Sequence, residues 1–112
     1  MQAVLRIGSL PEAALDAAAA FHRRYLPEAR SRLEGESDAL ALVFLAAPYD
    51  HSGWRKAAVA DLARESAPKR VNGVAGSDAA AIDATLAWLA QAPGITGQLF
   101  AVDGTGAGNS GV

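Results

Sequence analysis

Four short apolar segments at similar intervals constrain the fold of this chain more than any other feature. They are rich in Val, Leu, Ile and Phe, and polar residues do not alternate regularly with the apolar ones. This pattern is typical of parallel strands that are covered on both faces of a sheet. The four predicted strands are Ala3–Ile7, Leu40–Leu45, Arg70–Val74 and Gln98–Val102.

A segment with helical spacing of apolar residues follows the first predicted strand. It covers residues 12–34. Ser9 and Glu12 stand three residues apart, which is the spacing of a capping box at the start of a helix, and Pro11 would lie in the first turn. Pro27 either kinks this helix or begins a second one, because proline lacks an amide hydrogen and clashes with the preceding turn.

The apolar stripe of this helix predicts which of its sides packs against the sheet. One member of the stripe is a histidine, for which we expect a core or interface position. Metal binding is not supported, because no second His or carboxylate stands at ligand spacing on the same helix. The stripe consists of Leu15, Ala18, Ala19 and His22.

Two further helices are predicted between the later strands. One covers about residues 53–67, with Asp50 or Ser52 as its cap. The other begins at Ser77 and ends before Pro93–Gly94. Because helical crossovers between parallel strands are right-handed, these elements predict an α/β domain with a four-stranded parallel sheet and helices on both faces.

Length and composition favour one domain without disulfide or thiolate-metal chemistry. The chain has 112 residues, 10 basic and 12 acidic side chains, a net charge of −2 and no cysteine. We expect a single domain over residues 1–104 and a glycine-rich flexible tail over 105–112, which includes the GxGxxG pattern at 106–111. The near-neutral charge gives no reason to expect nucleic acid or a membrane as partner, so we expect a soluble cytoplasmic domain.

Two motifs in the second half of the chain resemble the short-chain dehydrogenase/reductase (SDR) family. Lys56-Ala57-Ala58, followed by Arg70–Val74 and Gly76, is similar to the family's YxxxKxA helix and RVNxVxPG strand. Ile95–Gly104, with the sequence ITGQLFAVDG, is similar to its closing strand. The resemblance implies a small Rossmann-like three-layer domain with the order β-α-β-α-β-α-β, which corresponds to the C-terminal half of the family's fold.

At the positions that carry chemistry in the family, this sequence departs from the pattern. Ser52 stands where the family has its catalytic Tyr, and Ala46 and Ala47 stand where it has its Ser. Lys56 alone matches, and without the Tyr it has no proton to transfer. The glycine-rich turn that would bind a dinucleotide pyrophosphate is missing after the first strand. We therefore expect no catalytic residue, no cofactor and no hydride transfer.

Polar residues that follow the predicted strands indicate a ligand crevice, because ligands of doubly wound sheets bind outside the carboxyl ends of the strands. His51 beside Asp50 could act as a base for an unrelated enzymatic activity. A capping Asp50 beside an exposed His51 is the simpler interpretation. The residues expected around the crevice are Ser9, Tyr49, His51 and Ser77.

A high density of alanine indicates association between helices. The chain has 27 alanines, many of them in the predicted helices 12–34 and 53–67, and the corresponding helices form the dimer interface of the SDR family. Arg6 is the one charge on the first strand, which we expect to form an open edge of the sheet. We expect a non-catalytic domain that acts by association, as a homodimer or with a full-length SDR protein. The alternative is a small-molecule-binding protein that uses the crevice.

Overall fold

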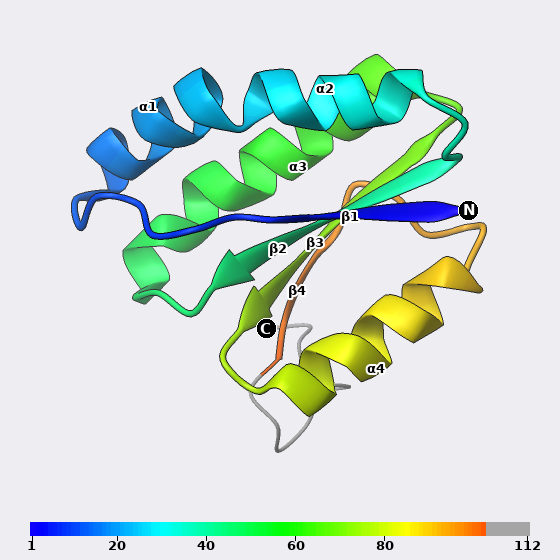
Figure 1. Ribbon diagram of the computed structural model, residues 1–112. Coiled ribbons are helices and arrows are strands. Elements are labelled where there is room, and N and C mark those ends of the chain that lie inside the picture. Colours follow the sequence, from blue (N-terminus) through cyan, green and yellow to red (C-terminus); the bar gives the residue numbers. More distant parts are fainter. Residues whose placement is uncertain (103–112) are drawn as a thin grey trace.

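The computed structural model, which describes residues 1–102, confirms a small Rossmann-like α/β domain with a four-stranded parallel sheet. The strands lie in the order β1-β2-β3-β4, so each strand pairs with the one before it in the chain (Figure 1). The predicted tail at 105–112 lies outside the described residues. The strands are β1 (Gln2–Arg6), β2 (Ala39–Leu45), β3 (Arg70–Gly76) and β4 (Leu99–Ala101).

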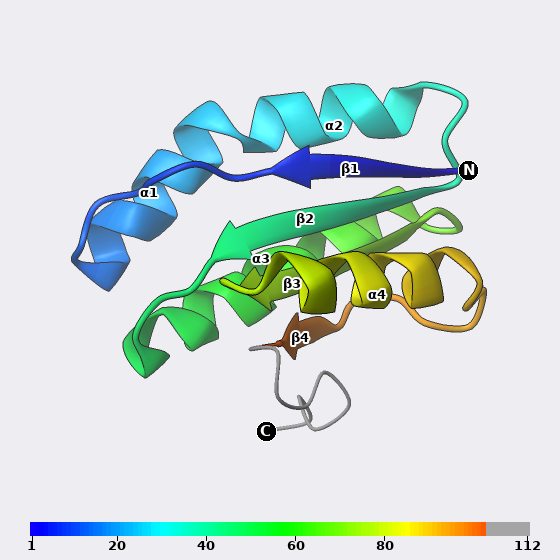
Figure 2. The same cartoon turned by 60° about the horizontal axis from the view of Figure 1, so that its bottom comes forward.

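In the described part of the chain, α-helices connect the strands and cover both faces of the sheet. Helices α1, α2 and α3 lie on one face and α4 lies on the other (Figure 1 and Figure 2). None of the helices within residues 1–102 is long and apolar enough to cross a membrane. The helices are α1 (Ala14–Arg24), α2 (Leu26–Glu34), α3 (Ser52–Ser66) and α4 (Ala79–Ala90), and one 3₁₀ turn at Tyr49–His51 precedes α3.

The central strands are buried on both faces, as their continuous apolar sequence predicts. Residues 39–44 of β2 and 71–75 of β3 are all buried. Because successive side chains of a strand point to opposite faces, these two strands contribute to two separate cores.

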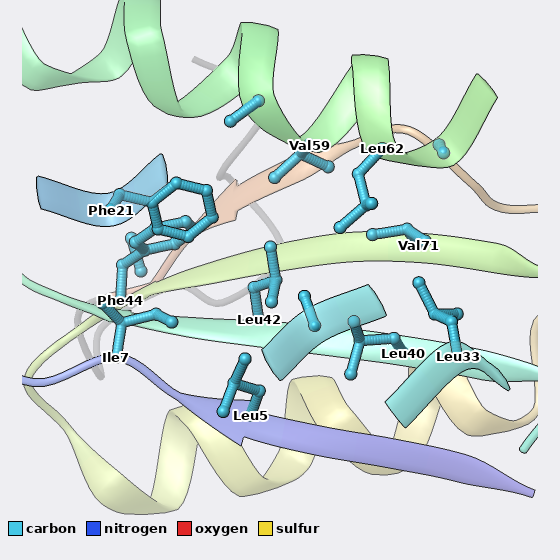
Figure 3. Close-up of a cluster of buried hydrophobic side chains, with 14 residues drawn as sticks. Leu5, Ile7, Phe21, Leu33, Leu40, Leu42, Phe44, Val59, Leu62 and Val71 are labelled. Atoms are coloured by element: carbon cyan, nitrogen blue, oxygen red, sulfur yellow. The ribbon is translucent and has the colours of Figure 1, made fainter. Parts of the chain in front are cut away.

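The larger core lies between the sheet and helices α1–α3. Figure 3 shows Phe21 of α1 together with Val59 and Leu62 of α3 above the side chains of the first three strands. The smaller core lies between the sheet and α4 and consists of Ala41, Val43, Val74, Ile82, Leu86, Leu89 and Val102. The sheet is therefore the wall that both cores share.

Pro27 divides the first predicted helix into two. Helix α1 ends at Arg24, and Pro27 lies in the first turn of α2, where its missing amide hydrogen removes no helical hydrogen bond. The predicted capping box is wrong, because α1 begins at Ala14 and its N-cap residue, Ala13, has no side chain that accepts a hydrogen bond. Residues Ser9–Glu12 lie instead in the loop that leaves β1.

The predicted apolar stripe of α1 has the wrong orientation. Leu15 and His22 are exposed, and the buried residues are Ala17, Ala20 and Phe21. An alanine-rich helix offers several stripes with helical spacing. The stripe that contains Phe21 faces the sheet, because this side chain buries the most apolar surface. His22 is therefore not a core residue, and its Nδ1 lies 2.7 Å from a carbonyl oxygen one turn earlier.

Strand β1 forms one edge of the sheet and is held by polar side chains. Gln2 donates to a carbonyl oxygen of α4 over 3.0 Å, and Arg6 lies 3.9 Å from Asp83 of the same helix. Arg32 of α2 donates to the carbonyl oxygen of Val4 over 2.7 Å. Within residues 1–102 no strand pairs with the outer side of β1, so these side chains supply part of the protection that such an edge needs.

An ion pair links α2 to α3. The Arg30 guanidinium donates two hydrogen bonds to the Glu65 carboxylate, from Nε over 2.8 Å and from Nη2 over 2.7 Å. These hydrogen bonds and the positive charge of Arg30 hold the pKa of Glu65 below its usual range.

We predict that Arg30→Gln raises the pKa of Glu65 towards its usual range, because the hydrogen bonds and the charge are lost. A carboxyl whose pKa is lowered by folding stabilises the fold above its unfolded pKa and loses this contribution as the pH falls through the folded pKa. The variant should therefore lose less stability than the wild type on acidification. NMR titration of the Glu65 carboxyl carbon measures the shift, and Arg64→Gln is the matched control. An unchanged pKa of Glu65 in Arg30→Gln would contradict the link.

Candidate functional site

The carboxyl ends of the parallel strands meet at one end of the sheet, where cavities open between the loops. A cavity of about 350 Å³ lies between the loops that follow β1 and β2. A second, of about 380 Å³, lies between the loop after β2, the start of α3 and the ends of β3 and β4. We call it the α3 cavity. A third, of about 620 Å³, borders α4.

The four residues predicted to surround one crevice lie around this end of the sheet but do not share a cavity. Ser9 and His51 both line the cavity between the loops after β1 and β2. Tyr49 is exposed and lines the neighbouring α3 cavity. Ser77 lines the cavity beside α4. The structure therefore places Ser9 and His51 at one cavity and Tyr49 and Ser77 at the two neighbouring cavities.

His51 is a buried residue that connects two loops. Trp54 Nε1 donates to His51 Nδ1 over 3.2 Å. The hydrogen of the neutral ring is therefore on Nε2, which donates to the carbonyl oxygen of Glu12 over 2.9 Å. The interpretation of an exposed His51 beside a capping Asp50 is wrong: His51 is 5% exposed, and among the described residues α3 has no side-chain cap. The Nε2 hydrogen bond holds the loop after β1 against the start of α3, and the bond from Trp54, in the first turn of α3, fixes the orientation of the ring.

The positions that carry catalysis in the SDR family line the α3 cavity. Ser52, at the Tyr position, is half-buried, and Lys56, one helical turn later, is exposed. Ala46 and Ala47, around the family's Ser position, form part of the same wall. The fold brings these positions together, but Lys56 alone among them has the side chain that the family uses.

Arg55 belongs to the site although neither family motif marks it. It is 7% exposed and lines both the cavity that contains Ser9 and the α3 cavity that contains Ser52. Its Cζ lies 4.7 Å from the ring centroid of Phe44 and 5.8 Å from that of Trp54. Burial lowers the pKa of Arg55 from its usual value, although an arginine keeps its charge in proteins.

A periodic signal for the burial of Arg55 is present in the sequence. Arg55 precedes Ala58 and Val59 by three and four residues and Leu62 by seven, and all of them are buried on the same side of α3. A charged residue within an apolar helical stripe is removed from water, and its charge then needs compensation. The spacing of the stripe therefore predicts that the charge of Arg55 is buried.

Within the described residues, the loop after β1 does not supply the glycine-rich turn that holds the pyrophosphate of a nicotinamide dinucleotide, the cofactor that the SDR fold implies. The loop after β1 contains one glycine, Gly8, and its amide donates to the Tyr25 hydroxyl over 3.0 Å, so it is not free for a phosphate. Gly76, which corresponds to the family's glycine near the nicotinamide, is required by packing. A Cβ at this position would lie 1.9 Å from the carbonyl oxygen of Val102.

Comparison with known families agrees with the two motifs. A family model described as short chain dehydrogenase-like protein (SDR-like) matches residues 5–102, which is most of the chain. The matched range contains both Lys56 and the strand Arg70–Gly76. A search of curated proteins and a search of solved structures each found no match.

We predict that Gly76→Ala destabilises the fold by about 2–4 kcal/mol, because the added Cβ overlaps the backbone of Val102 and the end of β4 must move. Gly53→Ala is the matched control. Nothing lies within 4 Å of a Cβ at this exposed position of α3, and alanine favours a helix over glycine by about 0.5–1 kcal/mol. Urea unfolding followed by circular dichroism measures both variants. Equal stability of the two would exclude so close a contact between β3 and Val102.

Proposed function

Because the chain belongs to the short-chain dehydrogenase-like family, we propose that it is a non-catalytic member whose function is association with other protein chains. The observation that carries the proposal is Ser52 in the Tyr position beside Lys56. An aliphatic hydroxyl is a much weaker acid than a phenol, whose pKa is about 10, so Ser52 cannot supply the proton that the family's Tyr supplies.

We propose a homodimer through the helices within residues 12–34 and 53–67. Helices α1 and α3 lie on the same side of the sheet (Figure 1), and their exposed residues include small ones such as Ala19 and Ala57. Leu15 is 86% exposed at the start of α1. Small side chains allow a second pair of helices to approach closely, and Leu15 offers apolar area for burial.

Two ion pairs on α2 and α3 lie next to this surface. Arg30 pairs with Glu65, and Arg64 pairs with Asp61. Removing a charged group from water costs less free energy when the group keeps its oppositely charged partner than when it is alone. A second copy presents the same surface and can form a two-fold interface. A full-length SDR protein that carries the corresponding helices is the other partner consistent with this surface.

We predict that the wild-type chain is a dimer at micromolar concentrations and that Ala57→Arg makes it a monomer, because a long charged side chain separates the helix faces. Ala57 is exposed, so the stability of the monomer should change by no more than about 0.5 kcal/mol. Ala84→Arg, at an exposed position of α4 on the opposite face, is the matched control and should remain dimeric. Sedimentation velocity measures all three. A monomeric wild type that also leaves a full-length SDR protein unbound would contradict the proposal.

Small-molecule binding at the carboxyl ends of the strands is the second candidate function. The α3 cavity has a volume of about 380 Å³, and ligand sites commonly enclose about 300–1,000 Å³. It combines apolar walls with the polar groups of Tyr49, Ser52 and Lys56 and with the buried charge of Arg55. Such a combination is typical of sites that orient a ligand by a few polar contacts.

Amide hydrogen exchange separates the two functions, because each slows exchange in the backbone that it covers or rigidifies. We predict that raising the protein concentration slows exchange in α1 and α3 and leaves the loops at 8–12 and 46–48 unchanged. In a second experiment, exchange is measured after the small-molecule fraction of the source cells has been added to the protein. Protection of those loops, with unchanged exchange in α1, would instead favour ligand binding as the main function.

A further inference from the structure

Within residues 1–102, Arg55 is a buried cation without an anionic partner. Its Nε is buried and has no hydrogen-bond partner within residues 1–102, and Arg55 takes part in none of the ion pairs found in that range. The rings of Phe44 and Trp54 compensate the charge in part. An unpaired charge that is removed from water still destabilises a fold, and proteins usually offset it with a counter-charge.

The α3 cavity has the charge of a site for an anion. Arg55 and Lys56 both line it, and among the described residues no acidic side chain does. Ser52 and Tyr49 add hydroxyl groups that can donate hydrogen bonds. The first turn of α3 also contains no acidic residue, so within that turn nothing offsets the positive end of the helix dipole.

The remaining wall of the α3 cavity is apolar. A strongly hydrated anion such as phosphate is usually held by several charged or amide donors around it. A carboxylate on a hydrocarbon body needs a planar cation at one end and apolar contact elsewhere, and the arginine fork matches a carboxylate. The apolar lining includes Ala46, Ala47, Pro48, Ala75, Leu99 and Val102.

We propose that Arg55 binds the carboxylate of a small monocarboxylic acid whose apolar body occupies the α3 cavity. The proposal rests on the second candidate function, ligand binding at the carboxyl ends of the strands, and names its ligand class. It requires neither the dimer nor hydride transfer. Arg55 supplies the charge and Lys56, which is exposed, lies at the edge of the site.

Titration of the full chain with acetate, butanoate, hexanoate and benzoate tests the proposal, followed by NMR of the backbone amide signals in every variant and of the Arg55 Nε–H signal where arginine is present. We expect saturable binding that tightens by about two- to fourfold for each added methylene group from acetate to hexanoate. Arg55→Met should weaken hexanoate binding by about thirtyfold or more, because the carboxylate would be buried without its partner. Arg64→Met, which removes an exposed arginine of the same helix, should bind hexanoate like the wild type.

The melting temperature gives a second measurement. Without a carboxylate, Arg55→Met should be at least as stable as the wild type, because it removes an unpaired buried charge. Hexanoate should raise the melting temperature of the wild type and of Arg64→Met but not that of Arg55→Met. If Arg55→Met does not fold, binding of hexanoate and of hexanamide to the wild type is compared, which tests whether the carboxylate charge contributes to binding.

Hexanamide has the same body as hexanoate without the charge, so it separates the role of Arg55 from ligand binding itself. Equal binding of the two would leave the cavity as a ligand site and overturn the role of Arg55. Binding of inorganic phosphate in place of the carboxylates would overturn the ligand class. Absence of saturable binding by every one of these compounds would overturn both this proposal and the second candidate function.

Discussion

The contacts of the Phe44 ring are the interaction on which the rest of this domain depends. The ring is fully buried near the end of β2, with its centroid 5.8 Å from that of Phe21 and 5.9 Å from that of Trp54. It therefore joins α1, the sheet and α3 in one cluster, and Arg55 lies over its face. Aromatic contacts of this kind add to the stabilisation that burial gives. Because the loop after β2 begins next to this ring, the cluster also fixes where the cavities open.

Next to this cluster, the α3 cavity departs from the SDR family's pattern at the Tyr position. Ser52 is much smaller than the Tyr of the family, and the α3 cavity extends beside it as far as Lys56. The buried charge next to this space comes from Arg55, at a position that the family's motif leaves unspecified. The small exposed residues of α1 and α3 lie outside the residues that line the α3 cavity, so the proposed association and the proposed ligand binding would use different surfaces of the domain.

The strands could be predicted from the sequence because a continuous apolar run has few other interpretations in a chain of this length. The start of α1 could not be predicted from the sequence. The loop before this helix is held by the hydrogen bond between His51 and the carbonyl oxygen of Glu12, and these two residues are 39 positions apart in the chain. The orientation of α1 was ambiguous because alanines occupy several sides of the helix, and the bulk of Phe21 decides between them. The environment of Arg55 depends on Phe44 and Trp54 lying beside it, which only the folded chain shows.

The order of the sheet also determines how the domain can be assembled. Because each strand pairs with its predecessor in the chain, no strand has to insert between two that are already paired. On the ribosome, where the N-terminal part emerges first, β1 and β2 can pair over α1 and α2 before α3 is complete. Each later strand then adds to the newest edge. Growth of the sheet follows the direction of synthesis, and among the described strands β4, the shortest, is added last.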